Sequence, residues 1–237
     1  MYSRDLSGAA PLGAADDFLE PDSVEVISPN DLGWVPSVRV GGIRTSLLTK
    51  SDLAELMIRD VESCRSGQLA YPRIVTSSNG YVVAKYNLRP DFKRIVDRAD
   101  IVDADGMPIV FASRLLCKNE IPERVATTDF VLTAAEAAVA HGTRFYFLGG
   151  KPGVAEEAAS NLRALFPALQ IVGIRNGYFS ADEVDTICKD IREAGTDVLW
   201  VGMGSPRQEE FAVANMRKLS GVAWVRTCSP SAPMAQI

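Results

Sequence analysis

The feature that most constrains the fold of this chain is an alternation of short apolar segments with segments that are apolar on one side at helical spacing. The last helices show this one-sided stripe clearly, for example Val154, Ala158, Leu162 and Leu165. Strands are predicted over residues 73–77, 101–104, 144–148, 169–174, 198–203 and 222–227, and helices over 81–87, 91–98, 107–117, 130–140, 152–166, 182–194 and 206–219. This pattern is typical of a mostly parallel sheet with helices on both faces. We therefore expect a single-domain, Rossmann-like α/β fold.

The first part of the chain follows a different pattern. Residues 1–35 mix Gly, Pro, Ala, Ser and acidic residues without sustained periodicity, which predicts a flexible N-terminal arm ahead of one domain over residues 36–237. A length of 237 residues with 47% hydrophobic positions is enough to bury one full core. Residues 38–43 predict a short strand or hairpin arm, and residues 51–64 a helix with Ser51 as its N-cap.

Charge and composition exclude several classes of function. A net charge of -5, with no long basic run, disfavours nucleic-acid binding. The four cysteines stand far apart without a C-x-x-C pair, so we expect reduced thiols rather than a zinc site or a disulfide framework. The chain lacks a run of about 18 apolar residues and the features of a signal peptide, which predicts a cytoplasmic protein.

The only histidine of the chain, His141, precedes Gly142 at the end of a predicted helix. This place favours an interaction of the imidazole with the free carbonyls of the helix. One histidine excludes a multi-histidine metal site and makes a Ser-His-Asp triad a poor hypothesis.

Polar residues and glycines follow five of the predicted strands. In an open parallel sheet, ligands bind beyond the carboxyl ends of the strands, so these positions predict a binding crevice. They are Thr76 to Gly80; Asp103, Asp105 and Gly106; Gly149, Gly150 and Gly153; Asn176 and Gly177; and Gly202 to Glu209.

Two glycine-rich turns each lead into a predicted helix. The N–H groups that open the helix after residues 149–153 could bind a phosphate, but Gly149 and Gly150 could equally serve only a tight turn. This segment is neither a dinucleotide fingerprint nor a P-loop. After Gly202 and Gly204, Ser205 suits an N-cap and Pro206 the first helical position, whereas Gln208 and Glu209 are candidates for substrate binding.

Asp105 is a candidate general base, because a carboxylate at the end of a strand could accept a proton from a sugar hydroxyl. Asp103 competes for the same role, and an Asp-Gly pair is also common in turns. Spacing alone does not choose between the two carboxylates.

Taken together, four ordered stretches resemble the WecG/TagA/CpsF family, glycosyltransferase family 26, over residues 38–222. As a set they are specific, although each one is weak alone. They are Ser77-Ser78-Asn79, similar to T-x-N; Ala99-Asp100 to Asp105-Gly106, similar to A-D-x-x-x-x-D-G; Leu148-Gly149-Gly150 with Pro152 to Glu156; and Gly202 to Glu209, similar to G-x-G-x-P-x-Q-E.

The resemblance implies an inverting transfer from a UDP-sugar to a polyprenyl-diphosphate-linked sugar, at the membrane surface and without a metal or other cofactor. It implies Asp105 as the base, which favours it over Asp103, with Gln208 as its catalytic companion. The substrate-binding residues implied are Ser77, Asn79, Arg124, Gly149, Gly150, Gly204, Pro206, Arg207 and Glu209, with Arg124 facing the diphosphate. As ordinary residues, Asn79 could cap a helix and Arg124 could be a surface cation. A homo-oligomer is left open.

The sequence departs from the family pattern at three places. Ser77 stands where threonine is usual, Thr127 where glycine is usual, and residues 226–233 replace a glycine-rich segment and a basic, aromatic tail. We therefore expect a weakened hold on the membrane surface. Two other functions stay open: a non-catalytic nucleotide-sugar-binding remnant, and a nucleotide-dependent oxidoreductase, which would need a dinucleotide fingerprint that the sequence lacks.

Overall fold

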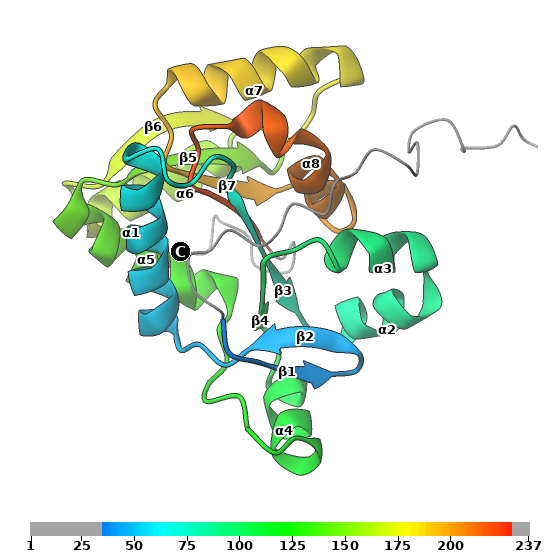
Figure 1. Cartoon of the computed structure of the whole chain (residues 1–237). Helices are drawn as coiled ribbons and strands as arrows, with labels where there is room; N and C mark the ends of the chain where they lie inside the picture. The colour runs from blue at the N-terminus through cyan, green and yellow to red at the C-terminus, as the bar shows by residue number, and fades with distance from the viewer. Residues whose placement is uncertain (1–34, 229–237) are drawn as a thin grey trace, which may run out of the picture. The chain divides into compact units, whose positions relative to one another are not determined.

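The computed structural model describes residues 35–228, and the predicted N-terminal arm lies almost entirely outside them. Six parallel strands form one sheet in the order β4-β3-β8-β7-β5-β6 (Figure 1). Their bounds are β3 Arg73–Ser78, β4 Ile101–Ala104, β5 Arg144–Gly149, β6 Gln170–Arg175, β7 Val198–Gly202 and β8 Trp224–Thr227. A separate antiparallel hairpin joins β1 (Ser37–Val40) to β2 (Ile43–Ser46). The predicted α/β fold with a mostly parallel sheet is confirmed.

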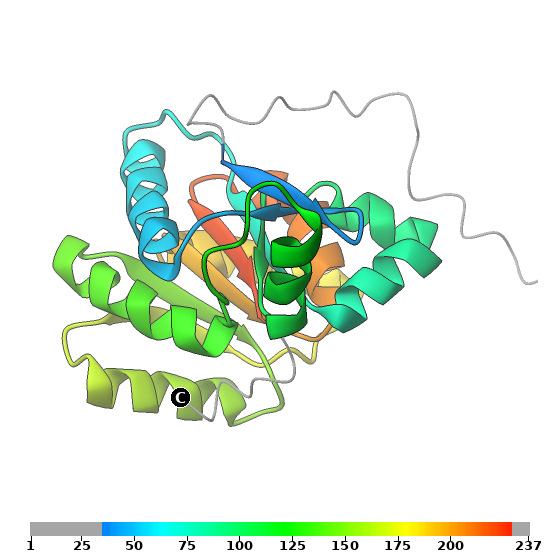
Figure 2. The same ribbon diagram turned by 90° about the horizontal axis from the view of Figure 1, so that it is seen from below.

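Helices cover both faces of the sheet (Figure 2). One face carries α1 (Lys50–Arg65), α5 (Thr127–His141) and α6 (Val154–Leu165); the other carries α2 (Gly80–Leu88), α3 (Pro90–Val96), α7 (Val184–Glu193) and α8 (Arg207–Asn215). Side chains alternate along β5 as a strand requires: Phe145 and Phe147 pack in the first core, Tyr146 and Leu148 in the second. Apolar residues thus face both layers, which explains the continuous apolar runs of the predicted strands.

Some helices begin at a different residue than predicted, because a capping interaction determines where the helix starts. Thr49, not Ser51, is the N-cap of α1: its hydroxyl accepts a hydrogen bond from the Asp52 N–H at 3.1 Å, and the Asp52 carboxylate accepts one from the Thr49 N–H at 2.9 Å. This reciprocal pair is a capping box, and it outweighs a lone serine.

The end of α5 lies where the sequence predicts it, with Gly142 in the left-handed conformation as its C-cap. Nδ1 of His141 lies 3.7 Å from the Glu62 carboxylate, and the interaction of the imidazole with the helix carbonyls stays a prediction. Arg65 donates to the carbonyl of Gly142 at 2.8 Å. The long side chain of Arg65, at the end of α1, thus supplies a positive charge to the C-terminal end of α5.

Two predicted helices begin or end in a 3-10 turn, which precedes α7 at Ala181–Glu183 and follows α8 at Arg217–Leu219. All four cysteines lie among the described residues and are free, as predicted. Within residues 35–228, no helix has the length and apolar character needed to cross a membrane.

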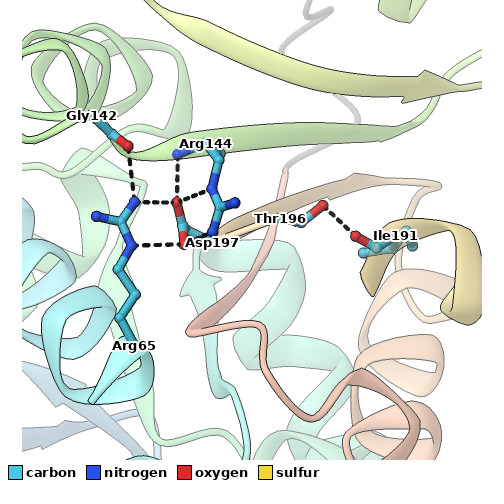
Figure 3. Close-up of polar contacts among 6 residues, drawn as sticks. All are labelled: Arg65, Gly142, Arg144, Ile191, Thr196 and Asp197. Carbon is cyan, nitrogen blue, oxygen red and sulfur yellow. Dashed lines mark hydrogen bonds and ion pairs between the residues drawn. The ribbon is translucent and has the colours of Figure 1, made fainter. Parts of the chain in front are cut away.

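The amino ends of β5 and β7 are joined through the buried carboxylate of Asp197 (Figure 3). Arg65 donates to its two oxygens at 3.2 and 2.6 Å, and Arg144 donates at 3.0 Å to each, with a further bond from the Arg144 backbone N–H at 2.8 Å. Burial opposes ionisation of Asp197, but the hydrogen bonds from Arg144 and Arg65 outweigh it and lower its pKa. This cluster ties α1 to two central strands at the edge of the sheet opposite the predicted crevice.

Candidate functional site

The loops that follow β3 and β4 lie against each other at the carboxyl edge of the sheet. The backbone N–H of Asp105 donates to the carbonyl of Ser78 at 2.9 Å, and a Cβ built on Gly106 would lie 3.4 Å from the Asn79 Cβ. Asn79 is the N-cap of α2, and its side-chain oxygen accepts the N–H of Val82 at 3.0 Å. The ordinary role predicted for Asn79 is therefore present, and it brings this residue next to the Asp105 loop.

Asp103 and Asp105 have different surroundings, although only Ala104 separates them. Asp103 is 1% exposed, and its Oδ2 lies 2.7 Å from Nη1 of Arg226, with which it forms a buried ion pair. Burial raises the pKa of Asp103, and the charge of Arg226 opposes the rise. Asp103 is thus enclosed and paired within the protein.

Asp105 is only half-buried, at the point where the chain leaves β4. Burial, and next the charge of Asp103, raise its pKa to about 6, while Arg226 and Arg124 oppose the rise. A partly accessible carboxylate with a pKa close to neutral pH is suited to accept and release protons. Of the two candidate carboxylates, Asp105 has the accessibility that a general base needs.

Arg226 is a residue of this site that the sequence analysis did not predict. Its side chain is fully buried on β8, and Nη2 donates to the hydroxyl of Ser77 at 2.9 Å and lies 3.3 Å from the hydroxyl of Thr127. It therefore links β3, β4 and the first turn of α5. An arginine inside an otherwise apolar predicted strand was the available signal, because a buried cation needs an anionic partner.

Thr127, one of the departures from the family pattern, is the first residue of α5 and supplies one of these hydroxyls. Ser77 is buried, so the hydroxyl predicted to bind substrate is engaged inside the protein in this structure.

Arg124 lies in the loop before α5 and forms an ion pair with Asp129 at 2.8 Å, with both side chains about two-fifths exposed. Exposed pairs of this kind contribute little to stability. The charge of Arg124 also acts on Asp105, whose pKa it lowers. The two expectations for Arg124, a surface cation and a charge beside the site, are thus compatible.

A second group of predicted residues surrounds the ends of β5 and β7, where main chain packs on main chain. A Cβ on Gly149 would lie 2.4 Å from the carbonyl oxygen of Gly202, so only glycine fits there. The N–H of Gly150 donates to that carbonyl at 2.9 Å, and the Gly177 N–H donates to the Gly150 carbonyl at 2.9 Å. These contacts support the tight-turn interpretation of the two glycines.

The first turn of α6 already holds an anion from its own helix. The carboxylate of Glu156 accepts the N–H of Gly153 at 3.1 Å, where a phosphate was predicted. A substrate phosphate there would share this helix end with Glu156, and phosphate binding stays a prediction.

The segment from Gly204 to Glu209 is held together by its own side chains. Gln208 and Glu209 are buried; Gln208 accepts the Gly204 N–H at 3.1 Å and donates to Glu209 at 2.9 Å. Burial raises the pKa of Glu209. Pro206 is the N-cap position and Arg207 the first residue of α8, so the predicted N-cap at Ser205 was wrong by one residue.

Arg207 donates to the carbonyl of Gly177 at 3.5 Å and so connects the loops after β6 and β7. The predicted site residues therefore form two groups at one edge of the sheet: one at β3 and β4, the other at β5 and β7. The strand β8 lies between them and carries Arg226. This arrangement brings a titratable carboxylate and glycine-rich loops together at the carboxyl edge of the sheet, where ligands bind in folds of this class.

The family model described as the glycosyl transferase WecG/TagA/CpsF family matches residues 38–231, most of the chain. The chain belongs to this family. As a WecG/TagA/CpsF glycosyltransferase it acts on a sugar donor and an acceptor, and the matched range includes every residue of the candidate site. Within residues 35–228, no group of three or more His, Cys, Asp or Glu side chains is arranged to hold a metal ion.

Proposed function

We propose that this glycosyltransferase moves a sugar, with inversion, from a UDP-sugar to a polyprenyl-diphosphate-linked saccharide. The setting proposed is the inner face of the cytoplasmic membrane, in the synthesis of a bacterial surface polysaccharide. The single observation that carries the proposal is Asp105, a half-buried carboxylate with a pKa of about 6 at the carboxyl edge of the sheet.

In the proposed reaction, the carboxylate of Asp105 takes the proton of the acceptor hydroxyl as its oxygen attacks the anomeric carbon of the donor. The new carbon–oxygen bond forms on the side opposite UDP, and the bond to UDP breaks with its electron pair leaving on the diphosphate. One displacement of this kind inverts the anomeric configuration.

The departing diphosphate needs positive charge, which Arg124 and Arg207 can supply from the edges of the crevice. The positive ends of α6 and α8, which follow Gly149, Gly150, Gly204 and Pro206, add a smaller contribution. Ser77, Asn79 and Glu209 complete the proposed substrate site. Gln208 would act through the Gly204 loop that it holds. The proposal requires no metal ion.

Replacing the base gives the direct test. We expect Asp105→Asn to reduce transfer from a UDP-sugar to a short-chain polyprenyl-diphosphate sugar by about 10²- to 10⁴-fold, because an amide cannot take the proton. Asp185→Asn, at an exposed carboxylate paired with Lys218, is the matched control. Near-normal turnover by Asp105→Asn would contradict the assignment, and loss of wild-type activity in EDTA would contradict metal independence.

A ligand-dependent melting experiment separates the competing functions. UDP should raise the melting temperature of wild type and of Asp105→Asn alike, since a ligand selective for the folded state stabilises it. Stabilisation by NADH but not by UDP would favour an oxidoreductase. Stabilisation by UDP without any transfer by wild type would favour a non-catalytic remnant.

A further inference from the structure

The helix α4 (Met107–Leu116) is apolar on its outer face as well as on its inner face. Its inner side chains, Ile109 and Val110, pack with Val40, Ala104 and Ile121. On the other side, exposure is 40% for Met107, 52% for Phe111, 83% for Leu115 and 81% for Leu116. Surface helices normally carry polar residues outward. This face therefore has the character of a contact surface.

The exposed side chains form a continuous stripe. Met107, Phe111 and Leu115 repeat every four residues, so they lie on one side of the helix, with Leu116 beside them. The helix lies at the bottom of Figure 1, beyond the β1–β2 hairpin, and nearest the viewer in Figure 2. The measured exposures place the stripe on the side of α4 away from Ile109 and Val110, which pack in the core.

The charges next to the stripe are basic, in a chain whose net charge is -5. The α4 sequence contains no acidic residue, Arg114 lies in its last turn, and Lys118 follows two residues after the helix ends. Two acidic groups are also near: Glu120 forms an ion pair with Arg114 at 3.3 Å, and Asp105 precedes the other end of the helix, so the basic charges gather at the Leu115 and Leu116 end. Apolar side chains flanked by Lys and Arg are the features of a helix that lies in a lipid interface.

The stripe also begins beside the candidate base. Gly106 is the N-cap of α4 and directly follows Asp105, so Met107 lies two residues from the carboxylate. A surface that contacted the start of the stripe would be close to Asp105.

We propose that the outer face of α4, formed by Met107, Phe111, Leu115 and Leu116, inserts into an anionic lipid surface. Arg114 and Lys118 then lie among the headgroups, and the Asp105 edge of the sheet is held next to the lipid. The lipid contact does not depend on the transfer reaction; its use, to hold the crevice near a lipid-linked acceptor, rests on the proposed function. A second copy of the chain is a weaker occupant, because four side chains fall far short of the roughly 20–30 residues a side in a stable dimer.

Vesicle co-sedimentation of the full chain, without donor or acceptor, tests this contact. Wild type should bind vesicles of phosphatidylglycerol and phosphatidylcholine, and the double variant Phe111→Ser, Leu115→Ser should bind at least tenfold more weakly. The matched control is Leu88→Ser, Leu165→Ser, which removes two exposed leucines from α2 and α6 and should bind like wild type. Melting temperatures confirm that each variant is folded.

A charge series should shift binding in both directions. Arg114→Gln should weaken binding to the anionic vesicles, and Glu120→Gln should strengthen it, each by up to about fivefold. Vesicles of phosphatidylcholine alone should not show this difference.

Equal vesicle binding by wild type and the Phe111→Ser, Leu115→Ser variant would overturn the proposal. So would a light-scattering result in which this variant turns a wild-type dimer into a monomer and leaves vesicle binding unchanged. A wild-type chain that binds vesicles through α4 but transfers no sugar would refute the proposed function and leave this inference intact.

Discussion

At the scale of single residues, burial gives Asp103 and Asp105 different chemistry. Asp103 is enclosed with Arg226, whereas Asp105 is half-exposed with a pKa of about 6. The sequence could not separate them, because their difference comes from an arginine about 120 positions further along the chain. The same long-range contact explains why Arg226 was not predicted: it joins the site only when β8 pairs with β3.

The raised pKa of Asp105 predicts the pH dependence of transfer. A general base must be ionised, so kcat/KM should be constant above about pH 7 and should fall about tenfold per pH unit below pH 6. Initial rates across pH 5 to 8 measure this profile. A profile that is flat through pH 6 would contradict the role of Asp105.

In the Asp103→Asn variant, the fall of kcat/KM on the acidic side of the pH profile, the acidic limb, should move to lower pH. The change removes a negative charge that raises the pKa of Asp105, and it leaves the positive charge of Arg226 without its partner. Because an unpaired buried charge costs about 3–5 kcal/mol, the melting temperature must be followed as well. The double variant Asp103→Asn, Arg226→Met removes both charges, and its limb should lie closer to that of wild type. A limb that moves to higher pH in Asp103→Asn would contradict this account.

At the scale of elements, the sequence predicted every strand of the sheet because each contains a short apolar run, even in the edge strand β6, which is only partly buried. The predicted helix ends were wrong where a hydrogen bond between nearby residues determines the first residue of the helix, as in the capping box of Thr49 and Asp52. Patterns of hydrophobicity do not contain that information. The outer face of α4 was also missed, because a helical period shows which residues are apolar but not which side is covered.

The close approach of β5 and β7 gives a prediction for Gly149. Gly149→Ala places a Cβ against the main chain of Gly202, which cannot move aside as a side chain can, so we expect a loss of about 1–3 kcal/mol in the free energy of unfolding. Gly153→Ala is the control, because a Cβ there meets nothing within 4 Å and costs only the strain of its positive φ, about 1 kcal/mol. Urea denaturation measures both. Equal losses would show that the contact with Gly202 is easily relieved.

At the scale of the whole domain, the two edges of the sheet have different roles. The Asp197 cluster joins helix and strands at the amino edge, and the candidate site residues follow the strands at the carboxyl edge. The sequence predicted the layers, since periodicity reports burial. It did not predict the strand order, because the place of β8 between β3 and β7 depends on contacts between distant segments.

Asp197→Asn should destabilise the domain without a direct effect on the site. We expect a loss of roughly 2 kcal/mol, because charge-assisted hydrogen bonds from Arg65 and Arg144 are weakened. The pKa of Asp197 is lowered in the folded state, so its contribution is complete above the ordinary value of about 4 and is lost as the pH falls through the folded value. The difference between wild type and variant should therefore shrink below pH 4.

Denaturation of both proteins at pH 7 and pH 3 measures this difference. The exposed pair of Asp185 with Lys218 gives the control, and Asp185→Asn should change stability by less than about 0.5 kcal/mol. Equal losses in the two variants would contradict the importance of the buried cluster.

The bare contact of Gly149 with Gly202 also bears on how this enzyme could change during evolution or in the laboratory. The hydrogen bonds at this contact are made by main-chain atoms, so they do not depend on the neighbouring side chains. A substitution at Gly149 would disrupt the contact rather than adjust it in small steps. Under the proposed function, variation in sugar preference would then arise from side chains around these glycines rather than from the glycines themselves. A library designed to accept a new donor sugar should leave Gly149 and Gly202 fixed and randomise the side chains around them, with the two diphosphate arginines, Arg124 and Arg207, kept.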